Sequence, residues 1–244
     1  MTPTRRPYAA RLALGLLAIA GAACTANVAV PAGSATTLSL RELDRRVSAA
    51  WPLVQRYRTI ETVERVGQSG QWEPTTPPAA TDFVLPDRKY RRPVDQSDPP
   101  GVEFMVVDAA IYQRIDGVWS IIDPTQVAPD SPVARSLDQL RTAGLDGPPF
   151  RLPKEVDGQL RSAGDELLDG RPCRWYEGTA QGPAGPVQLR VALEQERDLP
   201  CKTEAEYDGP SGRARNAIRY FDYNGAIRIE PPGSAATAGS ATAG

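Results

Sequence analysis

Two stretches in the C-terminal half of the chain alternate between apolar and polar side chains. Apolar residues occupy every second position of residues 187–193, and residues 201–208 follow the same pattern. Successive side chains of a β-strand point to opposite faces of its sheet. Such alternation is typical of strands with one buried and one solvated face, which antiparallel sheets provide and fully covered parallel sheets do not. We therefore expect an antiparallel sheet with one solvent-exposed face.

Two-residue turn signals connect further β-rich stretches. They are Asp116-Gly117, Asp169-Gly170 and Asn224-Gly225. These residue types tolerate the positive φ angles of a tight hairpin, so each pair predicts two antiparallel strands joined by a turn. About ten strands are expected in all. They cover residues 57–66, two short strands within 81–92 broken at Pro86, three strands within 101–123, and residues 159–168, 171–179, 187–194, 201–208, 216–223 and 226–232.

Two segments carry helix signals. Ser39 followed by Glu42 forms a capping box before apolar residues at helical spacing, and Pro52 ends or kinks this first helix. Ser131 and Pro132 begin a second amphipathic helix, which closes at Gly144. Helices with one apolar stripe cover the apolar face of a sheet. The sequence thus predicts an α+β fold, a large curved antiparallel sheet with about two helices packed over its concave face.

The chain contains no histidine. The usual general base near neutral pH, the Ser-His-Asp and Cys-His nucleophile systems and nearly all zinc sites are therefore excluded. We expect no catalytic residues, no metal site and no cofactor, although carboxylate pairs or a metal held by oxygen ligands alone are the forms in which an enzyme could still exist.

The N-terminus has the pattern of a cleavable export signal. Residues 1–11 are basic and free of acids, and an apolar run follows from Leu12 to Ala23. A run of this length matches the apolar region of a signal peptide and is too short to span a hydrocarbon layer of roughly 30 Å as a helix. Residues 1–23 are predicted to be a signal peptide. Its removal takes away three arginines and no acid, which leaves 25 basic against 30 acidic residues and argues against nucleic acid as a partner.

Three small residues, 21–23, lead directly into Cys24. This segment resembles the lipobox of bacterial lipoproteins, whose cysteine is acylated and becomes the new N-terminus, so Cys24 is the predicted lipid attachment to the bacterial cell membrane. The family usually has Leu, Val or Ile where this chain has Gly21. The alternative is an ordinary secretory signal that leaves Cys24 as an unpaired thiol. The Arg5-Arg6 pair lacks the apolar residues that should follow it in a twin-arginine signal.

Export places the chain where disulfides persist, and two cysteines remain once Cys24 is assigned to the lipid. Cys173 with Cys201 is the intramolecular pair that leaves the lipidation site free. The loop that this bridge closes would stabilise the fold by about 3 kcal/mol. We expect a structural role rather than a redox one, because the chain has no CxxC motif.

The ends of the mature chain are low in complexity. Residues 24–37 are small and nearly uncharged, as in a flexible tether, and residues 233–244 have the composition of a disordered tail. One β-domain is expected over residues 38–232, since neither an internal repeat nor a second core is evident. The protein is expected to be a monomer.

The order helix, strands, helix, strands over residues 38–232 resembles the LolA/LppX/LprG group of lipoprotein-carrier and lipid-binding lipoproteins. The likeness is carried by IRYFDYNGAIRIEPP at 218–232, AIYQRIDGVWSIID at 110–123 and LDGRPCRWYEG at 168–178. Members of that group have an unclosed β-barrel with helices in its opening and bind acyl chains. The resemblance implies a lipid or acylated partner, captured or transferred outside the cytoplasm.

Apolar strand residues supply the predicted lining of a cavity beneath the two helices. They are Phe104, Val106, Tyr112, Trp119, Ile121, Leu189, Val191 and Leu193. The alternative is that the same residues fill a dry core. A second functional hypothesis is a tethered sensor or regulator that binds another membrane or periplasmic protein through its sheet, since edge strands and an acidic surface suit that role as well.

Overall fold

A computed structural model describes residues 36–94, 102–123, 127–128, 131–145, 147–148, 157–182, 185–209, 212–233 and 236–237. All of them belong to one compact unit, Ala35–Gly244. The predicted signal peptide, Cys24 and the predicted tether up to residue 35 lie outside the described residues, as does most of the predicted tail.

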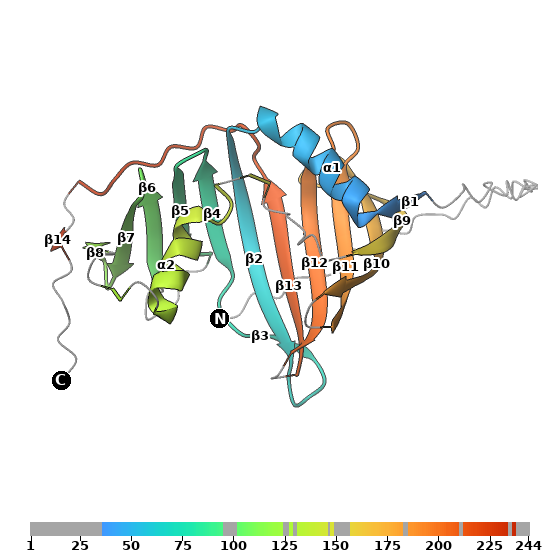
Figure 1. Cartoon of the computed structure of the whole chain (residues 1–244), viewed down its shortest axis with the longest axis horizontal. Helices are drawn as coiled ribbons and strands as arrows, with labels where there is room; N and C mark the ends of the chain where they lie inside the picture. Colours follow the sequence, from blue (N-terminus) through green and yellow to red (C-terminus); the bar gives the residue numbers. More distant parts are fainter. Residues whose placement is uncertain are drawn as a thin grey trace, which may run out of the picture. The chain divides into compact units, whose positions relative to one another are not determined.

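The fold is a single large sheet that does not close on itself (Figure 1). Its strands run in the order β1-β9-β10-β11-β12-β13-β2-β4-β5-β6-β7-β8-β14, and β3 pairs with β2. All pairings are antiparallel except that of β14 with β8. The strands are β1 (Thr37–Ser39), β2 (Arg56–Val66), β3 (Trp72–Pro74), β4 (Ala79–Val84), β5 (Arg88–Pro93), β6 (Glu103–Val107), β7 (Ala110–Ile115), β8 (Val118–Ile122), β9 (Asp157–Leu168), β10 (Arg171–Gly182), β11 (Gly185–Glu194), β12 (Pro200–Gly209), β13 (Gly212–Phe221) and β14 (Ala236–Thr237).

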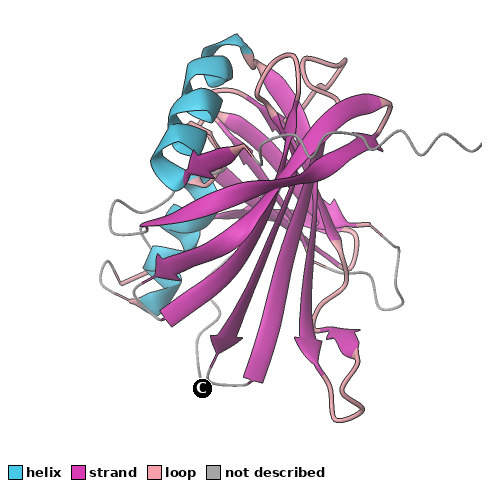
Figure 2. Cartoon of the chain, turned by 90° about the vertical axis from the view of Figure 1, so that its right-hand side faces the viewer, coloured by secondary structure: helices cyan, strands magenta, loops and turns pink. Residues whose placement is uncertain are grey.

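Two α-helices lie on one face of this sheet, as Figure 2 shows. Helix α1 (Leu40–Ala50) begins at the predicted cap, where Ser39 Oγ accepts from the Glu42 amide at 3.2 Å, and it continues into a short 3-10 helix, Trp51–Leu53. Helix α2 (Pro132–Thr142) begins in the same way, with Ser131 Oγ accepting from the Ala134 amide at 3.1 Å. The predicted α+β fold, an unclosed barrel with two helices over its concave face, is confirmed.

Each helix covers its own apolar cluster on the concave face. Leu40, Leu43 and Val47 of α1 are buried against side chains of β9, β10 and β11. Beneath α2 the cluster is aromatic and contains Tyr57, Phe83 and Tyr220, and none of the α2 side chains is buried. Helix α1 is therefore part of the core, whereas α2 rests on it.

The outer face of the sheet is polar and solvent-exposed over β9 to β13 and β2, and it is apolar around β6. Across β9 to β13 and β2, ion pairs join neighbouring strands, among them Arg190–Glu204 and Arg215–Glu64. On β6, Met105 and Val107 are buried, and they are covered by Ile227 and Ile229 from the segment after β13. The sheet thus has a second, smaller core on its outer face.

The prediction of a strand over residues 226–232 is wrong. Residues 226–232 form no strand, although Ile227 and Ile229 alternate with exposed neighbours as strand residues do. Both edges of β2 are already occupied by β13 and β4, so the segment has no free edge there to join. Asn224 turns the chain out of the sheet: its side chain accepts from the Gln55 amide at 2.8 Å and donates to Leu53 O at 2.9 Å. The alternation of buried and exposed residues in 226–232 therefore reflects packing against a face of the sheet.

Among the residues that the structure describes, neither helix has the length and apolar character needed to span a bilayer.

Candidate functional site

A pocket of about 400 Å³ lies between α2 and the concave face of the sheet. Its floor comes from four neighbouring strands, β13, β2, β4 and β5, and its roof comes from α2 and the residues that follow it. The lining residues are Thr59, Glu61, Thr81, Phe83, Lys89, Arg91, Ser136, Gln139, Leu140, Ala143, Gly144, Ile218 and Tyr220.

Small side chains at the centre of the sheet explain why the space is open. Thr59 of β2 pairs directly with Thr81 of β4, so two short side chains stand next to each other beneath α2. Larger residues flank them in the same cross-strand row, with Tyr220 on one side and Arg91 on the other. A helix that rests on the larger side chains cannot descend onto the threonines, and the gap between them is the pocket.

An aromatic wall closes one side of the pocket. Tyr57 and Phe83 pair across β2 and β4, and their rings stack with centroids 4.2 Å apart. The Tyr57 hydroxyl donates to Gly144 O at 2.8 Å and so holds the C-terminal end of α2. Gly144 has φ +80°, and a Cβ there would lie 2.6 Å from Phe83. Glycine is required at this position because any side chain would push α2 off the wall.

Tyr57 of the aromatic wall and Tyr220 of the floor stay neutral over the whole physiological range. Burial raises the pKa of Tyr57 far above its ordinary value, and the neighbouring Tyr220 adds to the effect. Burial likewise raises the pKa of Tyr220 to about 12. Their hydroxyls therefore hold fixed hydrogen-bonding roles rather than titrating ones.

Charged side chains of β2 and β5 also line the pocket. Arg91 Nη1 donates to Glu61 Oε2 at 2.8 Å, and Asn216 Nδ2 donates to Glu61 Oε1 at 3.1 Å, so both carboxylate oxygens are engaged. Lys89, two residues before Arg91 on β5, is only 5% exposed, and its Nζ donates to Ala143 O at 3.0 Å. The pocket is therefore amphiphilic, because its lining combines apolar and charged side chains.

The eight residues predicted to line a cavity lie in three different places. Leu189, Val191 and Leu193 are buried beneath α1. Val106 belongs to the aromatic cluster beneath α2, and Phe104 is the cross-strand neighbour of Arg91. The other three are on the outer face: Tyr112 and Trp119 pack beside Met105 and Ile229, and Ile121 pairs directly with Tyr112. None of the eight is among the residues that line the pocket under α2.

Similarity to known proteins concerns the architecture. No protein-family model matches the chain, and no curated protein matches it. Among solved structures, the chain is similar to MucB, with 15% identity over 74% of this chain and a TM-score of 0.35, and it spans 56% of that protein's length. It is also similar to a LolA superfamily protein from Nitrosomonas europaea (10% identity, 80% of this chain, 96% of that chain, TM-score 0.31). A third is a putative outer membrane lipoprotein-sorting protein domain from Vibrio parahaemolyticus (10% identity, 77% of this chain, 92% of that chain, TM-score 0.32).

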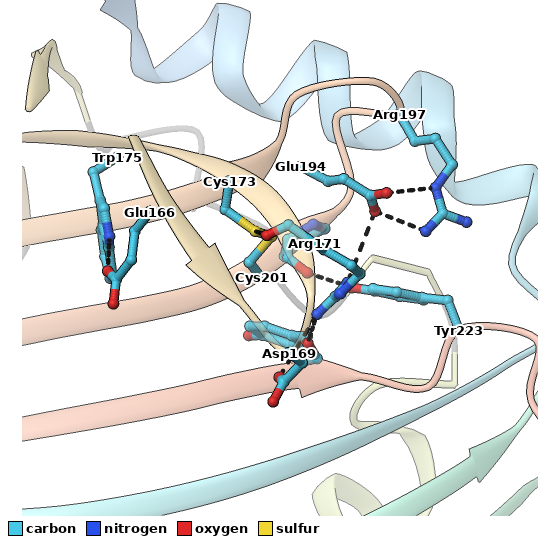
Figure 3. Close-up of a disulfide and its surroundings, with 11 residues drawn as sticks. Glu166, Asp169, Arg171, Cys173, Trp175, Glu194, Arg197, Cys201 and Tyr223 are labelled. Carbon is cyan, nitrogen blue, oxygen red and sulfur yellow. Dashed lines mark hydrogen bonds and ion pairs between the residues drawn. A yellow bond between two sulfur atoms is a disulfide. The ribbon is translucent and has the colours of Figure 1, made fainter. Parts of the chain in front are cut away.

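Away from the pocket, Cys173 of β10 and Cys201 of β12 form the disulfide that the sequence suggested (Figure 3). Beside it, the Arg171 guanidinium lies 3.8 Å from Glu194 Oε2 and 5.4 Å from the centre of the Tyr223 ring. Tyr223 in turn donates to Pro200 O at 2.8 Å. The bridge therefore belongs to a network that ties the end of β11 to the segment after β13.

Proposed function

We propose that this chain is an extracytoplasmic lipoprotein that binds or transfers an amphiphile in the pocket beneath α2. The observation that carries the proposal is an amphiphilic cavity roofed by a helix with no buried side chain. Its volume of about 400 Å³ falls in the range of roughly 300–1,000 Å³ that is typical of small-molecule sites.

The walls match an acyl chain. Phe83, Leu140 and Ile218 present apolar surface, and each buried methylene contributes about 0.8 kcal/mol. About ten methylenes would supply roughly 8 kcal/mol before the costs of association, which places a single-chain amphiphile at micromolar dissociation constants or weaker. The pocket suits one chain better than several.

Helix α2 is suited to admit such a ligand. At its C-terminal end Tyr57 and Lys89 donate to Gly144 O and Ala143 O, whereas Leu137 and Leu140 are only partly buried on the aromatic cluster. Displacing a helix that buries no residue fully costs little apolar contact. We propose that α2 pivots about this end, so that a chain enters beneath the rest of the helix.

The N-terminal sequence supports an extracytoplasmic, membrane-anchored location for the protein. The basic and apolar signal segment, the small residues before Cys24 and the disulfide all support a chain that is exported and anchored through Cys24 to the cell membrane. A pocket held near a lipid surface meets membrane amphiphiles at high local concentration.

Organic extraction followed by mass spectrometry tests this function on protein purified from its native host. We expect a co-purified amphiphile at about one molecule per chain, and an intact mass that lacks residues 1–23 and carries a lipid on Cys24. Protein that contains no extractable amphiphile, and that also fails to bind an added fluorescent fatty acid, would contradict the binding proposal. A retained signal segment would contradict the location alone.

One observation favours a second candidate, a tethered module that binds another envelope protein. Among the described residues, the outer edge of β9 is paired only by β1, over Gln159–Arg161, with one more hydrogen bond from the Ser162 amide to Thr36 O. Beyond it the edge is exposed, and Leu167 is 69% accessible. An open edge can accept a strand from a partner. A photo-crosslinker at position 167 that captures one specific protein, with or without a filled pocket, would favour this candidate.

A further inference from the structure

We infer that one end of the sheet, formed by the β7–β8 hairpin and the start of β6, is a docking surface for a lipid bilayer. The surface consists of the exposed side chains of Val102, Ile115 and Val118, which we call the docking row. The inference rests on the proposed function, because it names the surface through which an amphiphile reaches the pocket.

The docking row lies on the face of the sheet that carries α2 (Figure 1). Ile111 of β7 pairs with Ile122 of β8, and both belong to the apolar cluster beneath α2. Ile115 and Val118 pair on the same two strands, nearer the turn. An even number of residues separates the two pairs on each strand, so their side chains point to the same face.

The docking row continues a cross-strand row of the pocket floor. Glu61, which lines the pocket, pairs with Ala79 of β4, and Ala79 pairs with Pro93 at the end of β5. The antiparallel registers of β5 with β6 and of β6 with β7 place Val102 and Ile115 next in this row. An acyl chain therefore has a path from the docking row to the pocket along one face of the sheet.

The side chains along this path are apolar and yet exposed. Val102 is 44%, Ile115 49% and Val118 64% accessible. On α2, Val133 lies one turn before Leu137 on the stripe that faces the aromatic cluster, and it is 56% accessible. Neighbouring exposed apolar side chains mark a surface that contacts another apolar surface.

The exposed residues lie at the end of α2 that the proposed pivot would move. Tyr57 holds the C-terminal end of the helix through Gly144 O, so the N-terminal end, with Val133, is the end that lifts. A chain that enters there from a bilayer meets apolar side chains first and is not transferred through water.

The border of the docking row has the composition of a membrane interface. Trp119 follows Val118 on β8 and packs beside Tyr90, with ring centroids 6.2 Å apart. Trp and Tyr favour the level of the lipid head groups. Arg135 of α2 forms no ion pair with a residue that the structure describes, so its guanidinium can bind a lipid phosphate. The acidic Asp116 lies in the turn beyond the row, where it stays among head groups.

The predicted anchor favours a bilayer over a protein as the occupant. A coil of the length of the predicted tether, residues 24–37, reaches roughly 20 Å. A lipid on Cys24 would keep the domain within that distance of the bilayer, which is then present at high effective concentration. A few apolar side chains are sufficient for contact under these conditions.

Position-specific fluorescence tests the docking on the full chain with phosphatidylcholine vesicles. A polarity-sensitive fluorophore is attached to Val118→Cys and, as a matched control, to Gln188→Cys, an exposed strand residue on the outer face. We expect nitroxide-labelled lipids to quench the label at position 118 and to leave the label at position 188 unchanged. Equal quenching at both positions, or none at position 118, would overturn the inference. Shielding at position 118 that rises with protein concentration in the absence of vesicles would also overturn it, because a second copy would then be the occupant.

Substitutions separate docking from ligand binding. In Ile115→Ser/Val118→Ser, transfer of a fluorescent fatty acid from vesicles to the protein should slow at least about tenfold, while the affinity for dodecanoate in solution stays unchanged. The matched control is Leu53→Ser/Leu167→Ser, which removes two leucines that are more exposed but lie away from the hairpin. It should accept fatty acid at the unmodified rate.

The outcomes distinguish this inference from the proposed function. Transfer at the unmodified rate in Ile115→Ser/Val118→Ser, or a loss of dodecanoate affinity in solution as large as the loss in transfer rate, would overturn the docking role. An unmodified protein that binds no dodecanoate, but whose label at position 118 is still quenched, would overturn the proposed function alone.

Discussion

Replacement of Thr59 by Phe is expected to weaken amphiphile binding at least about tenfold and to leave the protein folded. Thr59 stands at the centre of the pocket floor, between Tyr220 and Thr81. A phenyl ring there would occupy the space that the two threonines leave open, so a bound chain would have to displace it. We expect the affinity for dodecanoate to fall at least about tenfold, while overpacking typically costs about 1–3 kcal/mol of stability.

The matched control for this substitution lies on the same strand. Thr62 of β2 faces the outer surface, where it lines a groove with Glu64 and Arg215. Thr62→Phe introduces the same ring into the same strand and should bind dodecanoate as the unmodified protein does. A Thr59→Phe variant that keeps full affinity and a native circular dichroism spectrum would place the ligand elsewhere.

Loss of the disulfide is expected to have the largest effect on stability. Cys173 and Cys201 are 28 residues apart in sequence, and closing a loop of that length stabilises a fold by about 3 kcal/mol in the chain-entropy account. Both cysteines are fully buried, so their replacement by alanine also removes core contacts. The Cys173→Ala/Cys201→Ala variant should therefore unfold in urea with a free energy lower by about 3 kcal/mol or more.

Reduction separates the two contributions. Dithiothreitol should lower the urea midpoint of the unmodified protein. The midpoint of the double alanine variant should not change, because that variant has no disulfide to reduce. An unmodified protein whose midpoint is insensitive to reduction, with both thiols titratable after unfolding, would contradict the stabilising role. The Arg171 and Tyr223 contacts beside the bridge should loosen with it, and a change in tyrosine fluorescence would report this loosening.

Local signals were sufficient to place most elements of the fold. Ser39 and Ser131 cap the two helices as expected, because an N-cap depends on a few neighbouring residues. The turns at Asp116-Gly117 and Asp169-Gly170 have the positive φ angles that their sequence predicts. By contrast, β1 and β3 escaped prediction, since three-residue strands carry too little pattern to be seen.

The orientation of β5 could not be predicted from its own residues. By alternation alone Tyr90 should face the core and its charged neighbours the solvent. The structure has the reverse, because Tyr90 packs on the outer face beside Trp119, where Ile227 and Ile229 from the C-terminal segment form a second apolar layer. The rule that the apolar face points inward fails where both faces of a sheet are covered.

The pocket escaped prediction for a related reason. Its floor exists because Thr59 and Thr81 are cross-strand partners, a register that depends on how β2 and β4 pair and that neither strand encodes alone. Threonines are small and partly polar, so large apolar residues, which were expected to line a cavity, do not mark their position in the sequence. Lys89 and Arg91 were passed over in turn because charged strand residues ordinarily face water.

The central claim is that the space beneath α2 holds an amphiphile, and its most direct test is a crystal structure of the protein with 12-bromododecanoate. Anomalous scattering locates the bromine independently of the protein. We predict a single bromine site beneath α2, between Phe83 and Ile218. A bromine site beneath α1 or on the outer face, or none at saturating ligand with an unfilled pocket, would contradict the claim.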